Sequence, residues 1–480
     1  MSTKVSAPHI MRQPDEVLNQ IISNVLVYPE RNWWRPDFDK FFGDARAILL
    51  TCRRFYHLAV PHLYRRLEIT WGRQGFHPSA TETATKHLHR TVNEDRSLHR
   101  HCLDLQVHIG DPDPAWQSWA IDFVTWLTRV QRLKISGGFH ASAAGYARND
   151  LALHVCDLDG AWEVIHAATQ SMPDLFELTI APTAYGHLSL PRTMSALRCA
   201  ARLRILHLNG ANTNTGHAWD VLPGSSPIAS LTLHNFKDSF HNLGHLLSLP
   251  SALDSFNLGP NVHTLQPSLS LQDPAFHHTS TLTNTIDSSW TLTNILDLLH
   301  AQRSTLTTLH LHALPSLPSQ QPPDLAQFEA LTDLTLTSHS TGHRPGTESF
   351  FIPPRLRRFT WTLGVGPDAE LPSPLDFMFG GEHERWLRRF AAICIRRGVP
   401  LCRIQLECVL DDQDWKRTGG TWVAVRWPWD YMDRLRGELE GYGIEVSFSS
   451  PMGGKPEGCI ELERLQPLGE VMAEVVGGTR

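Results

Sequence analysis

Histidine and cysteine are the residue types of this chain best suited to metal binding or nucleophilic chemistry. The 480 residues include 27 histidines and 8 cysteines. Candidate ligand clusters occur at His310-x-His312, at His99-x-His101-Cys102 and at Asp411-Asp412-Gln413-Asp414. Zinc requires three or four convergent ligands, and a calcium loop requires a glycine and a terminal glutamate. None of the three clusters meets these requirements, so the sequence predicts no metal site and no cofactor.

The motifs that position a catalytic nucleophile, a zinc-bound water or a phosphate are also missing. The sequence has no Gly-x-Ser-x-Gly, no His-Glu-x-x-His and no Gly-x-x-x-x-Gly-Lys segment. The tryptophan-rich region with Trp415, Trp422, Trp427 and Trp429 is more typical of the cap on a terminal repeat. We therefore expect a protein that is not an enzyme and has no catalytic residues.

The net charge and the cysteine spacing indicate which partners and which cellular compartment to expect. The formal net charge is -6 and the pI is near 6.5, so no basic surface for nucleic acid or for a membrane is expected. No apolar run approaches the ~18 residues that span a bilayer. Met1 to Met11 lack the apolar core of a secretory signal. Because no CxxC pair occurs either, these features favour a cytoplasmic or nuclear protein with free thiols.

Leucine recurs in a fixed frame, Leu-x-x-Leu-x-Leu, along the middle of the chain. Copies of the frame, some with another large apolar residue, begin at residues 203, 228, 253, 306, 331, 356 and 401. Four of the six intervals are identical in length, from 203 through 228 to 253 and from 306 through 331 to 356. The interval from 253 to 306 is close to two repeats, which predicts a degenerate copy near Leu282 and Ile286. A strand followed by a helix at a constant interval is typical of leucine-rich solenoids.

The frame therefore predicts an α/β repeat solenoid, an irregular leucine-rich-repeat-like stack. Earlier strand-like segments begin near Leu103, Leu133 and Leu178. The repeats are irregular because the asparagine or cysteine that follows this frame in leucine-rich repeats is present only at Asn261. The alternative is an ordinary α/β domain with leucine-rich strands, whose connections usually vary in length.

Side chains between the leucines should line the concave face of such a stack, because successive strand residues point to opposite faces. Polar residues at these positions either solvate the sheet or bind a target protein. The expected target-binding residues are His207, Asn209, His234, His310, His312, Thr335, Thr360 and Glu407.

The N-terminal part of the chain, up to residue 70, has a different, helical pattern. Residues 14–26 carry apolar side chains at helical spacing, namely Val17, Leu18, Ile21, Ile22, Val25 and Leu26. A second helix is expected from near Asp44 to Pro61, followed by a short apolar turn that includes Leu63 and Leu67. Together these segments predict a small all-α helical bundle.

Two segments of this region resemble the F-box. Gln13-Pro14-Asp15-Glu16-Val17-Leu18 and the apolar residues after it resemble the opening helix. Leu50-Thr51-Cys52-Arg53-Arg54-Phe55-Tyr56-His57-Leu58-Ala59 resembles the later helix, and its continuation to Leu67 is similar to fungal members. Gln13 replaces the usual leucine, and the segment between the helices, with Trp33 and Trp34, is longer than usual.

The resemblance implies a docking module that binds a Skp-family adaptor and, through it, a cullin scaffold. The chain would then be the substrate-recognition subunit of an SCF-type ubiquitin ligase, with an unknown protein substrate. The implied adaptor-binding residues are Pro14, Val17, Leu18, Ile21, Leu50, Cys52, Phe55 and Leu58. Alternatively, these residues only pack the core of the bundle, and the chain is a leucine-rich-repeat interaction scaffold without a ubiquitin role.

The expected domain organisation follows from these patterns. It comprises a disordered N-terminus (1–9), the F-box-like bundle (10–70), a polar linker (71–100), the leucine-rich-repeat-like domain (101–450) and a C-terminal tail (451–480).

Overall fold

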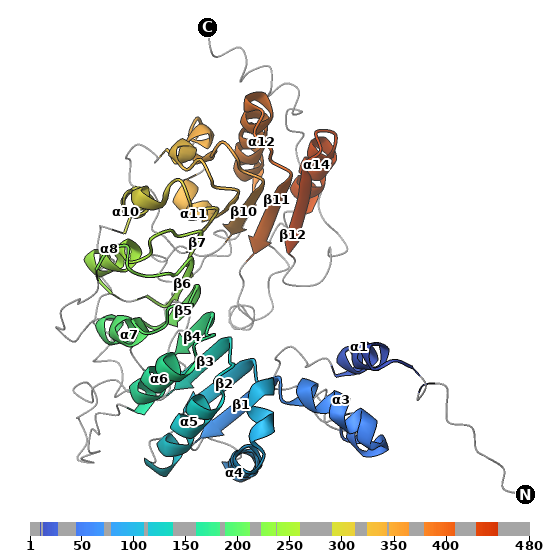
Figure 1. Ribbon diagram of the computed structural model, residues 1–480. Helices are drawn as coiled ribbons and strands as arrows, with labels where there is room; N and C mark the ends of the chain where they lie inside the picture. Colours follow the sequence, from blue (N-terminus) through green and yellow to red (C-terminus); the bar gives the residue numbers. More distant parts are fainter. Residues whose placement is uncertain are drawn as a thin grey trace, which may run out of the picture. The chain divides into compact units, whose positions relative to one another are not determined.

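The computed structural model divides into two compact units, Met1–Arg204 and Ile205–Arg480 (Figure 1). The residues that it describes are 10, 13–26, 45–71, 78–109, 114–137, 160–182, 188–211, 222–236, 238–259, 290–312, 324–342, 345–363, 379–408 and 429–449. The expected disordered N-terminus, the C-terminal tail and the degenerate repeat near Leu282 lie outside these residues.

The first unit begins with a small helical bundle. Helix α1 spans Asp15–Val25, residues 45–51 are helical, and α3 spans Arg53–Leu63. The helix expected from Asp44 to Pro61 is interrupted at Cys52, whose φ of -167° and ψ of 167° are extended. Pro61 lies in the last turn of α3 and does not end the helix before Leu63. The buried core of the bundle consists of Leu18, Ile22, Leu26, Ala45, Phe55 and Ala59.

Four parallel strands follow in the first unit. They are β1 (Arg66–Trp71), β2 (Asp104–Ile109), β3 (Arg132–Gly137) and β4 (Glu177–Ala181), and each pairs with the next. Strand β1 corrects the expectation of an apolar turn around Leu67. Leu67 and Ile69 pair with Leu105 and Val107 of β2, and all four side chains are buried.

Residues 78–101 are helical, which differs from the expected linker. Helix α4 spans Pro78–Glu94, and a 3-10 helix, η2, spans Arg96–His101. The helical pattern is weak in the sequence because a small polar residue, Thr85, stands at a buried position and donates a hydrogen bond to the Thr70 carbonyl of β1 (3.2 Å). The same unit contains α5 (Pro114–Trp126), α6 (Gly160–Ser171) and α7 (Leu190–Leu197).

The described residues of the second unit form eight parallel strands that follow one another in the order of the chain. They are β5 (Ile205–Asn209), β6 (Ser230–His234), β7 (Ser255–Leu258), β8 (Thr308–Leu311), β9 (Asp333–Thr337), β10 (Arg358–Leu363), β11 (Arg403–Cys408) and β12 (Glu445–Ser449). Its helices are α8 (Phe240–Ser248), α10 (Leu292–Leu298), α11 (Ser338–Thr341), α12 (Gly381–Arg397) and α14 (Trp429–Glu440), with 3-10 helices η5 (His300–Gln302), η6 (Leu325–Gln327) and η7 (Glu348–Phe351). The expected α/β repeat arrangement of parallel strands and helices is confirmed.

The apolar frame determines the register of these strands. Neighbouring strands align the second position of the frame, which is Leu206, Leu231, Phe256, Leu309, Leu334, Phe359 and Ile404. All seven side chains are at most 1% exposed. The alternate residues face the other side of the sheet, as the strand period of two requires.

The long interval between the frames at Leu253 and Leu306 does not insert a repeat strand into this sheet. Strand β7 pairs directly with β8, with Phe256 opposite Leu309. The next described helix, α10, is capped by Thr291, whose hydroxyl accepts a hydrogen bond from the Asn294 backbone N–H. The register is unchanged across this longer connection.

Connections differ in length on the two sides of each strand in the second unit. From β7 onward, four to six residues separate each strand from the last α-helix or 3-10 helix described before it, as between Arg397 of α12 and Arg403 of β11. The connection from a strand to the next described helix is far more variable: β9 runs directly into α11, whereas the whole segment 259–291 separates β7 from α10. Among the described residues, no helix is both long and apolar enough to cross a membrane.

Candidate functional site

Helix α1 exposes a stripe of large apolar side chains. Val17, Ile21 and Val25 follow one another at every fourth position and are 41, 40 and 47% exposed. We call these three residues the α1 stripe. On the adjacent face of the helix, Leu18 and Ile22 are buried in the bundle core. The bundle core therefore covers only one of the two apolar faces of this helix.

Polar contacts fix α1 against α3. Arg54 of α3 donates hydrogen bonds to Asp15 Oδ1 (2.7 Å) and to the Gln13 carbonyl (2.6 Å). His62 Nε2 lies 2.8 Å from Asn19 Oδ1. Burial, and secondarily the charge of Arg65, lowers the pKa of His62. These contacts fix the position of the α1 stripe relative to α3.

The residues implied as adaptor contacts fall into three groups. Pro14, Val17, Ile21 and Leu50 are exposed, with Leu50 at 73%. Cys52 and Leu58 are half-buried and pack against the bundle core. Leu18 and Phe55 belong to that core and are buried within the bundle.

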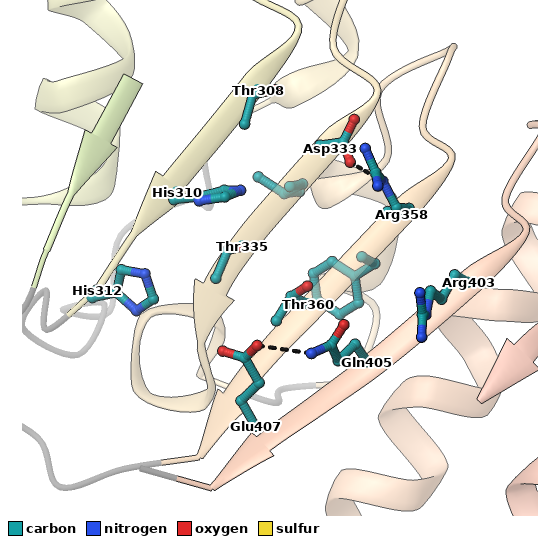
Figure 2. A pocket seen from close by; sticks show the side chains of 12 residues that line it. Thr308, His310, His312, Asp333, Thr335, Arg358, Thr360, Arg403, Gln405 and Glu407 are labelled. Atoms are coloured by element: carbon teal, nitrogen blue, oxygen red, sulfur yellow. Dashed lines mark hydrogen bonds and ion pairs between the residues drawn. The ribbon is translucent and has the colours of Figure 1, made fainter. Parts of the chain in front are cut away.

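A pocket of about 350 Å³ lies on the polar face of the second unit. Strands β8 to β11 provide its lining in parallel rows, because their residues share one register (Figure 2). The lining residues are Thr308, His310, His312, Asp333, Leu334, Thr335, Arg358, Phe359, Thr360, Arg403, Gln405 and Glu407.

Ion pairs occupy the end of the pocket nearest the strand starts. Arg358 Nε donates to Asp333 Oδ1, and this contact raises the pKa of the arginine. Arg403 pairs with Glu445 of β12 (3.3 Å). At the other end of the pocket, Gln405 Nε2 donates to Glu407 Oε1 (2.9 Å).

The two histidines of the pocket are held in their neutral form. Burial lowers the pKa of His310, and it lowers the pKa of His312 to about 4, with smaller contributions from the charges of His310 and His234. The rings of His310 and His312 are edge to face, 6.5 Å apart. A neutral imidazole has one donor and one acceptor nitrogen, so each ring can both give and accept a hydrogen bond.

Five of the eight expected target-binding residues lie together in this pocket: His310, His312, Thr335, Thr360 and Glu407. The other three do not line it. His207 lies on β5, and Asn209 of β5 accepts a hydrogen bond from Asn235 (2.7 Å) beyond the end of β6, the strand that carries His234.

Sequence reasoning missed the row formed by Thr308, Asp333, Arg358 and Arg403. The signal was present, because all four residues precede the second apolar position of their frame and thus share its register.

No group of three or more histidine, cysteine, aspartate or glutamate side chains in the described ranges could hold a metal ion. Comparison of the chain with protein-family models and with curated proteins gives no match.

Proposed function

We propose that this chain is an F-box protein, the substrate-recognition subunit of a cullin-based SCF-type ubiquitin ligase. In this proposal the helices of residues 10–70 bind a Skp-family adaptor, and the leucine-rich-repeat-like strands of the second unit bind a target protein. The observation that carries the proposal is the exposed α1 stripe on the segment whose sequence resembles the opening F-box helix.

The energetics of the stripe favour a protein partner. Burying a large aliphatic side chain contributes about 1.5–3 kcal/mol. Because each residue of the stripe is already more than half buried, a partner would gain about 1 kcal/mol from each of the three. An amphipathic helix that inserts such a row into an apolar groove is a recurring mode of protein recognition.

The repeat strands support the target-binding half of the proposal. Their polar face carries a pocket, and solenoid proteins bind partners along such faces. A chain that holds the ligase at one end and a target at the other raises the effective concentration of the target at the ubiquitin-loaded enzyme. The chain itself would supply no catalytic group.

The second candidate is a leucine-rich-repeat interaction scaffold without a ubiquitin role. Gln13 favours it, because F-box helices usually have leucine at this place. The same binding experiment separates the two candidates, since only the first requires the adaptor.

The test is complex formation between the full chain and a recombinant Skp-family adaptor, measured by co-purification and titration. Val17→Asp with Ile21→Asp should weaken the complex at least tenfold, because both charges would be placed in an apolar contact. Gln20→Asp is the matched control, since Gln20 is exposed on the same helix outside the stripe. Leu18→Asp is unsuitable, because it would place a charge in the bundle core.

Unchanged circular dichroism and thermal unfolding must accompany the loss in the double variant. A well-folded chain that forms no adaptor complex would overturn the proposal, and so would full binding by the double variant.

A further inference from the structure

The charges of the β8–β11 pocket are not all paired with an opposite charge. Arg358 has Asp333, and Arg403 has Glu445. In the described part of the chain, the contact of Glu407 is the neutral amide of Gln405, and no arginine, lysine or histidine forms an ion pair with it. Among the described residues, the pocket therefore has one charge without an opposite partner, the negative charge of Glu407.

We propose that this pocket binds a cationic side chain, lysine or arginine, of the target protein, with Glu407 as the ion-pair partner. The identity of the ligand as a segment of a target rests on the proposed function; the preference for a cation does not. A partner that covers the pocket removes water from Glu407, and burying a carboxylate without an opposite charge is unfavourable. A ligand that brings a positive charge avoids this loss.

The remaining polar groups near Glu407 can accept hydrogen bonds. The hydroxyls of Thr335 and Thr360 lie between the histidine strand and the Gln405–Glu407 pair (Figure 2), and neither makes a hydrogen bond within the described residues. The Gln405 amide nitrogen points to Glu407, which leaves its carbonyl oxygen as an acceptor. Ammonium and guanidinium groups only donate, so they match this set.

The histidines fit a cation because they are uncharged. Burial keeps His310 and His312 neutral at pH 7, and each ring then adds an acceptor nitrogen without repelling a positive ligand. An anionic ligand would have to draw Arg358 from Asp333 or Arg403 from Glu445, so the existing ion pairs disfavour it.

The test uses the full chain and a set of N-acetylated, C-amidated heptapeptides of glycine and serine that differ in the central residue. That residue is lysine, arginine, norleucine, acetyl-lysine or glutamate, so the terminal charges are absent and the two cation sources are compared directly. Dissociation constants from fluorescence anisotropy should be at least tenfold lower for the lysine or the arginine peptide than for the three others.

Glu407→Gln should remove this preference, whereas Glu440→Gln should retain it. Glu440 is exposed on α14, outside the pocket lining, and the change of charge is the same. Tighter binding of the glutamate peptide, equal binding of all five peptides, binding too weak to measure for both cationic peptides, or an unchanged preference in Glu407→Gln would each overturn the inference.

The peptide comparison on the unaltered chain decides the matter even if the Glu407 variant does not fold. Because no adaptor is present in this assay, its failure is distinguishable from failure of the ligase proposal. Loss of adaptor binding with a retained cation preference would remove only the proposed function.

Discussion

His312 should make the stability of the second unit depend on pH. In the folded chain its pKa is lowered to about 4 from the ordinary 6.5, mainly because the half-buried ring loses hydration and secondarily because of His310 and His234. The unfolded chain has the ordinary pKa and so takes up a proton on this histidine at a higher pH than the folded chain does. Stability is therefore fully present above pH 6.5 and is lost as the pH falls towards 4.

The size of the effect follows from the difference between the two pKa values. Each unit of difference corresponds to about 1.4 kcal/mol. Between pH 7 and pH 4, the shift of His312 therefore removes about 3 kcal/mol from the free energy of unfolding. Below pH 4 both states carry the proton, and His312 contributes no further change.

The assay is urea unfolding of the full chain at pH 7, 6, 5 and 4, followed by circular dichroism and fitted as two transitions for the two units. His312→Gln removes the titrating group and keeps a polar side chain. The variant should lose about 3 kcal/mol less than the original chain over this range, while His310 and His234 remain as a common background.

His300→Gln is the matched control, because His300 is exposed on η5 in the same unit. It should leave the pH dependence as it is. An equal loss of stability in His312→Gln and in the original chain would refute the lowered pKa of His312.

Three further outcomes test the core, the thiols and the buried charges. Trp361→Ala should destabilise the second unit by about 3–5 kcal/mol in urea unfolding, since the ring is fully buried; a loss below about 1 kcal/mol would contradict the packing. Cys102, buried and with its pKa raised to about 12, should resist iodoacetamide under native conditions while exposed Cys402 is alkylated, as read by mass spectrometry; equal labelling would contradict this. Arg388→Leu should cost about 3–5 kcal/mol in the same unfolding assay, because it removes one of two arginine partners of fully buried Glu384, the other being Arg434, and also the partner of Glu438; a neutral result would contradict it.

The strands of the second unit could be predicted because the Leu-x-x-Leu-x-Leu frame determines both where each strand lies in the sequence and how it aligns with its neighbours. Leu206, Leu231 and Phe256 recur at one constant interval in the sequence and are adjacent in space. Strand β1 escaped prediction because it has only part of the frame: Leu67 and Ile69 alternate with the polar residues Glu68 and Thr70. Its identity as a strand depends on pairing with β2, which local spacing does not reveal.

The sequence also does not determine which face of α1 is buried. Positions 17, 18, 21, 22, 25 and 26 are all apolar, so two neighbouring faces of the helix are equally suited to burial. Contact with α3 decides between them: Leu18, Ile22 and Leu26 enter the core, and Val17, Ile21 and Val25 remain outside. Sequence spacing identified the apolar helix, and packing determines which of its apolar residues stay exposed.

The sequence predicts several single residues that line the pocket, but not which of them pair with one another. Single residues such as His310 and Thr335 could be assigned to the polar face from alternation alone. Pairing of Asp333 with Arg358 required knowledge that a separation of one repeat interval brings two side chains to neighbouring strands. That Glu407 forms no ion pair within the described residues can be seen only after such pairs have been assigned.

The unequal connections of the second unit have a consequence for how its sequence can change over time. The short segment between each helix and the next strand brings the chain back to the same register, even after the long segment 259–291 that follows β7. Insertions and deletions after a strand can therefore accumulate without shifting the repeats that follow. Because the strands are parallel, all such length changes begin at one edge of the sheet, so related proteins could diversify that edge while the frame and the N-terminal bundle stay constant.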